Sequence, residues 1–203
     1  MNKHLSGLME RYPVLKPLRD EIMNAFDALT QSYRNDGKLL VCGNGGSAAD
    51  ADHIVGELMK GFYLKRELDS NVKQKFGSLG DKLQGALPAI SLTHHTALST
   101  AFQNDVDPSL IYAQQVFGYG KCGDVLFAIS TSGNSLNIIN AIKIAKASGL
   151  VTIGLTGRSG GEMMDLCDIC INVPSDITAE VQELHLPVYH TLCAMLEEEF
   201  FGI

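Results

Sequence analysis

The chain contains no tryptophan, and aromatic residues make up only 7% of its 203 residues. It has no concentrated basic segment either, because 16 Lys and Arg stand against 23 Asp and Glu and give a formal net charge of −7. Its longest apolar runs, such as residues 125–129, fall far short of the roughly 20 residues that span a bilayer. No apolar signal-peptide segment follows the first residues. We therefore expect a cytoplasmic protein with no nucleic-acid and no membrane partner.

Cysteine occurs five times, an odd number spread over strand-like and helix-like segments, as is usual for reduced cytosolic thiols. The sequence therefore implies no disulfide framework. Cys167 and Cys170 have the CxxC spacing of a zinc or redox pair, but no second CxxC accompanies them. We interpret both as core residues, with metal or redox chemistry as the alternative.

The chain does have enough apolar material for one core, since 45% of its residues are hydrophobic and 19% are charged. Five short runs are continuously apolar, and helical periodicity fills the segments between them. This order predicts a single α/β domain over residues 1–203, doubly wound around a five-stranded parallel sheet flanked by helices. An amphipathic helix over residues 17–35 is expected to pack outside the sheet. The predicted strands are residues 38–42, 89–92, 125–129, 151–155 and 169–173.

Residues 61–85 form the least regular stretch of the chain, with mixed charges and few large apolar side chains. Loops of this length in compact domains are usually functional lids or disordered segments. The sequence leaves two interpretations open, a flexible lid and an inert surface insertion.

Two loops rich in glycine or hydroxyl residues each join a predicted strand to a predicted helix. Residues 43–47 read Gly-Asn-Gly-Gly-Ser, and residues 130–135 read Ser-Thr-Ser-Gly-Asn-Ser. Free N–H groups and hydroxyls at a helix N-terminus can hold a phosphate group without any Lys or Arg. Neither loop matches a dinucleotide fingerprint or a P-loop, so no nucleotide cofactor is expected. The alternatives are a tight structural turn for the first loop and an ordinary helix cap for the second.

Polar side chains on two predicted helices are further candidates. His53 and Glu57 lie four residues apart, so they share one helix face and can bind a metal or supply a base. Gln182 and His190 lie in an otherwise apolar helical segment near the end of the chain, where Pro187 predicts a kink or a late start. The alternatives are an exposed ion pair for the first two and a satisfied core histidine for the last.

Taken in chain order, the two loops, the His53–Glu57 pair, residues 104–105, and Gln182 with His190 resemble the SIS (sugar isomerase) domain family over about residues 15–200. Glu57 and His190 together narrow the resemblance to the phosphoheptose isomerases of that family. The resemblance implies a flavodoxin-like fold and an aldose–ketose isomerase that converts sedoheptulose 7-phosphate to D-glycero-D-manno-heptose 7-phosphate through an enediol. It also implies one zinc ion per subunit, and a homotetramer with active sites between subunits.

The same resemblance assigns roles residue by residue. Glu57 and His190 would be the catalytic base and the second acid/base group. Together with His53 and Gln182, these two would also bind the zinc ion. The implied substrate-binding residues are Asn44, Gly45, Gly46, Ser47, Glu57, Asn104, Asp105, Ser130, Thr131, Ser132, Ser135 and Gln182.

The chain departs from the family pattern at three places. Gly61 stands where the family usually has an arginine, Ala179 replaces an acidic residue, and the insertion over residues 64–85 is longer than usual. One geometric point also stands out, because Gln182 and His190 are eight residues apart, about 12 Å along an ideal helix. Binding one ion with both side chains requires a kink or ligands from different subunits.

A second function class competes with the enzyme. A close SIS relative is a non-catalytic tetramer that binds a bacterial replication initiator, but it lacks the glutamate and the final histidine.

For the assembly, we expect the first and last helices to meet their copies in a helical bundle, because one sheet face cannot cover all their apolar side chains. The side chains expected there are Ala25, Phe26, Leu29, Leu192, Met195 and Phe200.

Overall fold

The computed structural model describes residues 2–202. A single, fully parallel sheet of five strands forms its centre, in the order β2-β1-β3-β4-β5. The predicted α/β class and all five predicted strands are confirmed. The strands are β1 (Leu39–Gly43), β2 (Ala89–Ser91), β3 (Val125–Ser130), β4 (Val151–Thr156) and β5 (Ile169–Asn172).

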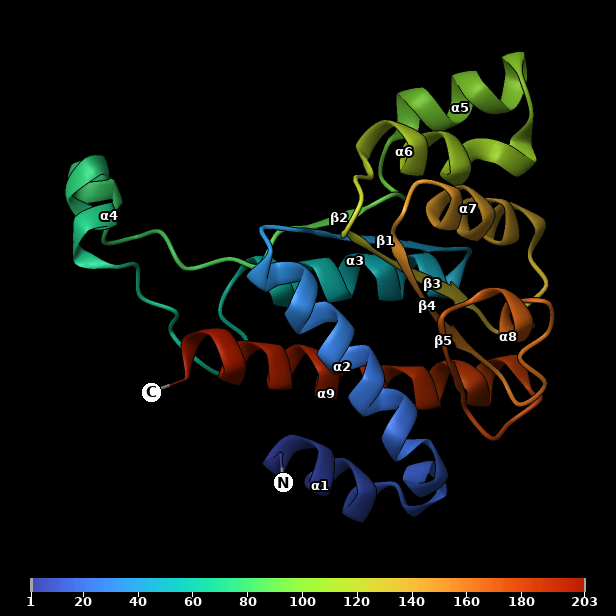
Figure 1. Cartoon of the computed structure of the whole chain (residues 1–203), viewed down its shortest axis with the longest axis horizontal. Coiled ribbons are helices and arrows are strands. Elements are labelled where there is room, and N and C mark those ends of the chain that lie inside the picture. Colours follow the sequence, from blue (N-terminus) through green and yellow to red (C-terminus); the bar gives the residue numbers. More distant parts are fainter. Residues whose placement is uncertain (1, 203) are drawn as a thin grey trace.

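Successive residues of each strand face opposite sides of the sheet, so the strands contribute to two hydrophobic cores. In β1, Leu39 and Val41 belong to one core, and Leu40 and Cys42 belong to the other. Helices cover both faces, as Figure 1 shows. The first core lies under α2 (Arg19–Arg34), α3 (Gly46–Met59) and α9 (Thr178–Phe201). The second lies under α6 (Ile111–Tyr119), α7 (Leu136–Ala147) and α8 (Met163–Leu166).

The N-terminal region contains more structure than the sequence predicted. A first helix, α1 (Lys3–Arg11), begins after Asn2, whose side chain accepts hydrogen bonds from two main-chain N–H groups of the first turn. A 3₁₀ helix, η1 (Pro13–Leu18), follows it, and the predicted helix over residues 17–35 is α2, which starts at Arg19. Both α1 and α2 pack against α9 (Figure 1).

This packing overturns the expected reason for a helical bundle between subunits. The apolar side chains that were expected to need a second chain are already buried within one chain, because α1 and α2 cover α9. Ala25, Phe26, Leu29, Leu192 and Met195 are each at most 8% exposed, and Phe200 is partly buried against the same core.

The last helix, α9, is unbroken across Pro187, so the expected late start is wrong. It begins at Thr178, nine residues before that proline. The Thr191 hydroxyl donates to the Pro187 carbonyl at 2.8 Å. None of the helices within residues 2–202, α9 included, is long and apolar enough to cross a membrane.

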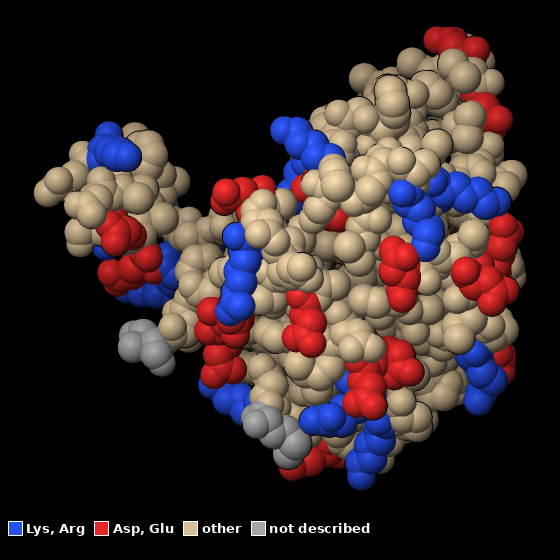
Figure 2. All heavy atoms as spheres, viewed as in Figure 1, with Lys and Arg blue, Asp and Glu red and all other residues tan. Residues whose placement is uncertain are grey.

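The irregular insertion forms an arm that stands away from the body of the molecule (Figure 1). It carries α4 (Ser70–Phe76) and the short 3₁₀ helix η2 (Gly77–Leu79), neither of which has a buried side chain. An antiparallel bridge between Glu67 and Gln84 closes its base. Figure 2 shows side chains of both charge signs on the arm and interspersed over the rest of this face.

A second projecting element lies beyond α6. It comprises α5 (Thr96–Asp105) and η3 (Pro108–Leu110), which lie at the top of Figure 1. No side chain of α5 is buried, and Phe117 on the adjoining α6 is 73% exposed. This part of the chain therefore presents apolar surface outside the two cores.

All five cysteines have free thiols. Cys167 and Cys170 are partly buried against the second core. Burial raises the pKa of the Cys167 thiol to about 12 and that of the Cys170 thiol to about 11, so both stay protonated at neutral pH. This supports their interpretation as core residues.

Candidate active site

The two predicted anion-binding loops lie side by side at the carboxyl edge of the sheet. β1 pairs directly with β3, and Gly43 at the end of β1 is level with Ile129. Gly45, which precedes α3, has a φ of +58°, a left-handed conformation that residues with a side chain rarely adopt. α3 and α7 thus start where the strand order reverses, which is where ligands bind in doubly wound sheets.

Side-chain hydrogen bonds join the two loops. The amides of Asn44 and Asn137 pair reciprocally, with both N···O distances at 2.9 Å. Ser130 Oγ and Ser135 Oγ lie 3.1 Å apart, and Ser130 and Ser47 are buried. The loops therefore offer hydroxyl and N–H donors at two helix N-termini, an arrangement suited to a phosphate group. Asn137 was missed from sequence, although an amide in the first turn of α7 is a visible signal.

A second polar cluster lies between α3 and α9. His53 Nε2 is 3.3 Å from Glu57 Oε1 and also 3.3 Å from His190 Nε2. The Glu57 side chain is mostly buried, at 13% exposure, and its other oxygen lies 3.3 Å from Lys60 Nζ. The structure therefore brings together three of the predicted site residues, with His53 in the middle. A carboxylate beside two imidazoles can exchange protons with a bound molecule.

Tyr189 orients His53, and sequence reasoning missed it because a tyrosine in an apolar helix reads as core. Its hydroxyl donates to Asp50 Oδ1 at 3.1 Å and lies 3.2 Å from His53 Nδ1. Because the hydroxyl proton goes to Asp50, the hydrogen bond to His53 requires a proton on Nδ1. The other ring nitrogen of His53, Nε2, faces Glu57 and His190.

Burial governs the electrostatics of this cluster. It raises the pKa of Asp50, against the opposing effects of the Tyr189 hydroxyl and His53. It lowers the pKa of His190, helped by His53 and Arg11 and opposed by Glu57. A His190 pKa below its ordinary value leaves a neutral imidazole at pH 7, which can both donate and accept a proton.

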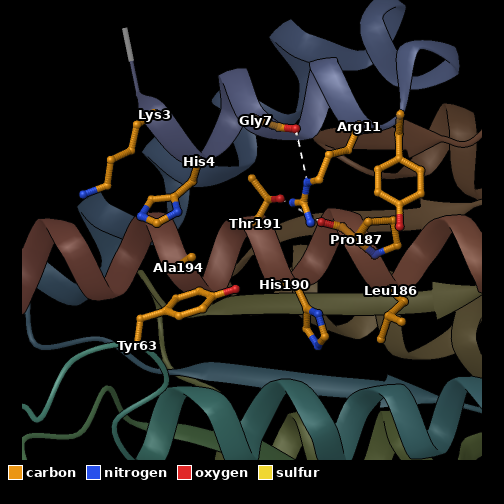
Figure 3. A pocket seen from close by; sticks show the side chains of 11 residues that line it. Lys3, His4, Gly7, Arg11, Tyr63, Leu186, Pro187, His190, Thr191 and Ala194 are labelled. Atoms are coloured by element: carbon orange, nitrogen blue, oxygen red, sulfur yellow. Dashed lines mark hydrogen bonds between the residues drawn. The ribbon is translucent and has the colours of Figure 1, made fainter.

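A pocket of about 210 Å³ lies on the other side of α9, between this helix and α1. Figure 3 shows His190 at its edge, with its ring turned from α9 toward α3, and Lys3, His4 and Arg11 across the pocket. Lys3 and His4 both pair with Glu198. Of these three side chains, only that of Arg11 has no carboxylate within ion-pair distance among the described residues.

Gln182 lies apart from the cluster because α9 runs along α3 in the same direction. A side-chain carbon at Gly46 would overlap the Gln182 amide, so Gln182 lies against the glycine loop, while His190 lies against His53. Over residues 2–202, no group of three or more His, Cys, Asp or Glu side chains is arranged to hold a metal ion. One chain thus assembles part of the predicted zinc set.

Asn104 and Asp105 are also separate from the loops. They end α5, both are exposed, and the Asn104 amide donates to the Asp105 carboxylate at 2.8 Å. Thr131, Ser132 and Ser135 do lie in the serine loop as predicted, where Ser132 Oγ accepts from the Asn134 N–H at 3.2 Å.

The structure shows the surroundings of Gly61 and Ala179, the two residues that differ from the family pattern. A side-chain carbon at Gly61 would overlap the carbonyl oxygen of Leu64, so the main-chain turn here excludes the arginine of the family pattern. Ala179 is exposed in the first turn of α9. Its neighbour Glu180 accepts a hydrogen bond from Ser175 Oγ at 2.6 Å.

The sheet order and the two loops are those of a doubly wound domain suited to binding a sugar phosphate. The family model described as "SIS domain" matches residues 8–75 and 70–157. A phosphoheptose isomerase from Campylobacter jejuni is 42% identical over 100% of this chain and 95% of its own length. One from Rhodospirillum rubrum is 43% identical over 87% of this chain and 85% of its own. The solved phosphoheptose isomerase from Neisseria gonorrhoeae superposes with a TM-score of 0.77 at 34% identity, covering 96% of this chain and 95% of that one. The chain belongs to the phosphoheptose isomerase family of SIS domain proteins.

Proposed function

We propose that this chain is an aldose–ketose isomerase that converts sedoheptulose 7-phosphate to D-glycero-D-manno-heptose 7-phosphate. The observation that carries the proposal is the approach of Glu57, His53 and His190 on helices that border the two phosphate-suited loops. The relatives named phosphoheptose isomerases, which match over most of the chain, support the same reaction class.

The reaction needs a proton to move between adjacent carbons. In the proposed mechanism the Glu57 carboxylate removes a proton from C1 of the ketose while His190 donates one to the C2 oxygen, which gives an enediol. Glu57 then returns its proton to C2, and His190 takes the proton of the C1 hydroxyl. A neutral His190 suits this double role, in line with its lowered pKa.

A non-catalytic scaffold that binds a replication initiator is not favoured. Such a scaffold has no need for a mostly buried carboxylate held beside two histidines. The relatives reported above are also named as enzymes.

Proton exchange in heavy water tests the proposal. NMR of sedoheptulose 7-phosphate incubated with the protein in D₂O should show deuterium entering at C1 and the aldose phosphate appearing. Fructose 6-phosphate, a ketose phosphate with one carbon fewer, is the control for dependence on the length of the sugar. Absence of exchange into any ketose phosphate by folded protein would refute the isomerase assignment.

We also propose a zinc ion at this cluster, bound by His53, Glu57 and His190 with Gln182 as the fourth ligand. Ligand atoms around a tetrahedral zinc with bonds of about 2.0–2.1 Å lie about 3.3–3.4 Å apart. The 3.3 Å distances from His53 Nε2 to Glu57 Oε1 and to His190 Nε2 agree with this value pair by pair, although within residues 2–202 the three side chains are not arranged around one ion. Because Gln182 of the same chain lies against the glycine loop, the fourth ligand would have to be Gln182 of a neighbouring chain. When bound, zinc would polarise the substrate carbonyl.

Tyr189→Phe tests the zinc proposal through the orientation of His53. Loss of the hydroxyl should weaken zinc binding about 10-fold or more, because groups that orient a metal-binding histidine typically contribute that much. Tyr33→Phe is the matched control, since the buried Tyr33 hydroxyl has no hydrogen-bond partner in the part of the chain that the structure describes. Competition with a chromogenic chelator measures the affinities. Zinc affinity unaltered by both Tyr189→Phe and His53→Ala would place any bound zinc elsewhere.

We propose that the protein acts as a cytoplasmic homotetramer with active sites between chains. Ser47 and Glu57 are ten residues apart on α3, about 15 Å along the helix. A sugar phosphate held at the loops of one chain would reach an acid/base pair more easily if a second chain presented it. The exposed apolar side chains of α5 and α6 support contact with another copy.

A further inference from the structure

A buried ion pair lies next to the candidate acid/base cluster. Arg66 Nε is 2.7 Å from Glu197 Oε1, and the two side chains are 0% and 1% exposed. Arg66 belongs to the base of the insertion, whereas Glu197 belongs to the last turns of α9. An ion pair buried this completely is costly to desolvate, so its further hydrogen bonds decide its role.

The arginine side of the pair holds the end of α3. Its guanidinium donates to the Leu58 carbonyl at 2.6 Å and to the Glu57 carbonyl at 2.8 Å. These carbonyls lie in the last turn of α3, which has no basic residue of its own. A cation at this place satisfies carbonyls that a helix end leaves unpaired and interacts favourably with the helix dipole. The main chain of Glu57 is thereby fixed.

The glutamate side of the pair holds the loop that follows α3. Its carboxylate accepts the N–H groups of Phe62 and Tyr63 at 2.7 Å and that of Leu64 at 3.1 Å. The ring of Phe62 lies 5.4 Å from the ring of His190. Burial raises the pKa of Glu197, but these N–H groups and Arg66 outweigh it and hold the pKa below its usual range. The carboxylate is therefore ionised at neutral pH.

The main chain at Arg66 is itself strained, with a φ of +44°. A side chain in this left-handed region usually costs free energy, so the surrounding contacts must maintain the conformation. Those contacts include the three polar groups already named, the Phe201 ring 4.9 Å from the guanidinium carbon, and the Gly85 N–H that donates to the Arg66 carbonyl at 2.7 Å.

We propose that Arg66 and Glu197 form a positioning pair, which fixes Glu57 through its carbonyl and His190 through the Phe62 loop. Neither side chain touches the reacting atoms. The inference deepens the proposed isomerase function and depends on it for its kinetic consequence. Its structural content, the placement of Glu57 and His190 by one buried pair, stands on the contacts alone.

Arg66→Lys tests the proposal, because lysine keeps the charge but cannot bond two carbonyls and a carboxylate in one plane. We expect kcat to fall about 10-fold or more, since small misplacements of catalytic groups cost this much, while KM changes less than about 3-fold. The matched control is Lys38→Met. It breaks the ion pair with Asp124 at the amino edge of the sheet, where Lys38 Nζ and Asp124 Oδ2 are 2.5 Å apart. The control should lose stability and keep its kcat.

Histidine ring NMR gives a readout that does not need activity. The ring signals of His53 and His190 should shift in Arg66→Lys and in Glu197→Gln and stay in place in Lys38→Met. Equal losses of kcat in Arg66→Lys and Lys38→Met, or unmoved ring signals in both pair variants, would overturn the positioning role. A wild-type protein inactive on ketose phosphates would refute the isomerase function, and the NMR comparison would still decide the positioning. If Arg66→Lys does not fold, the Glu197→Gln result decides.

Discussion

Replacing Glu57 with glutamine lowers turnover at least about 10²-fold, the loss expected when a general base is removed. Glutamine has nearly the shape of glutamate, so it keeps the packing of the mostly buried side chain between His53 and Lys60. It cannot accept a proton from a carbon. Folding and sugar-phosphate binding should therefore stay close to those of the wild type.

The measurement is kcat from the heavy-water exchange assay, with thermal unfolding and calorimetric binding on the same samples. Glu162→Gln is the control, because the Glu162 side chain is half exposed and, among the described residues, forms an ion pair only with Lys143. Near-normal turnover by a folded Glu57→Gln sample would remove Glu57 from the mechanism. Reassembling Glu57→Gln chains with Ser132→Ala chains extends the test, since sites made from the loops of one chain and the acid/base pair of another regain partial activity in mixed oligomers, whereas sites within one chain do not.

The second large effect concerns the pH dependence of stability. His185 is fully buried on α9, and within residues 2–202 neither of its ring nitrogens has a hydrogen-bond partner. Burial lowers its pKa from 6.5 to about 4, and the nearby main chain of Thr156 opposes the shift only in part. The unfolded chain therefore binds a proton between these two pH values that the folded chain does not.

Stability should consequently fall as the pH drops from 6.5 toward 4, and His185 contributes nothing to this slope above 6.5. The full difference of about 2.5 pKa units corresponds to about 3 kcal/mol. Urea unfolding at pH 7 and pH 4.5 measures most of this difference in the wild type, and His185→Leu, which leaves no ring nitrogen to protonate, should lack it. The exposed His94→Gln is the control. Identical pH slopes for the wild type and His185→Leu would contradict the prediction.

The sheet and the loops could be predicted because each rests on local chemistry. Runs without a polar residue give strands buried on both faces, and the glycine-rich and serine-rich segments mark the turns at their carboxyl ends. That the loops meet depends on the pairing of β1 with β3, which the doubly wound pattern implies. The reciprocal pair of Asn44 with Asn137 could not be predicted, since it depends on the register of two distant segments.

Other parts of the site were hidden because their side chains resemble ordinary residues. Arg66 is one of several charged residues in an irregular stretch, and only the fold shows that it enters the core to meet Glu197. Tyr189 reads as an apolar helix residue until His53 is placed beside it. The burial of the first and last helices was misjudged because α1 was not foreseen, although Leu5, Leu8 and Met9 recur at helical spacing.

Because contacts at its base close the arm, the number of residues in the arm can change without moving the points where it joins the body of the molecule. Glu67 bridges Gln84 and Arg66 meets Gly85, so the two ends of the arm are already in contact where they leave the body. Lengthening or shortening the chain between them changes the cost of closing a loop only slowly with residue number. An epitope or a fluorophore inserted within residues 68–83 is therefore expected to leave the closed base of the arm in place.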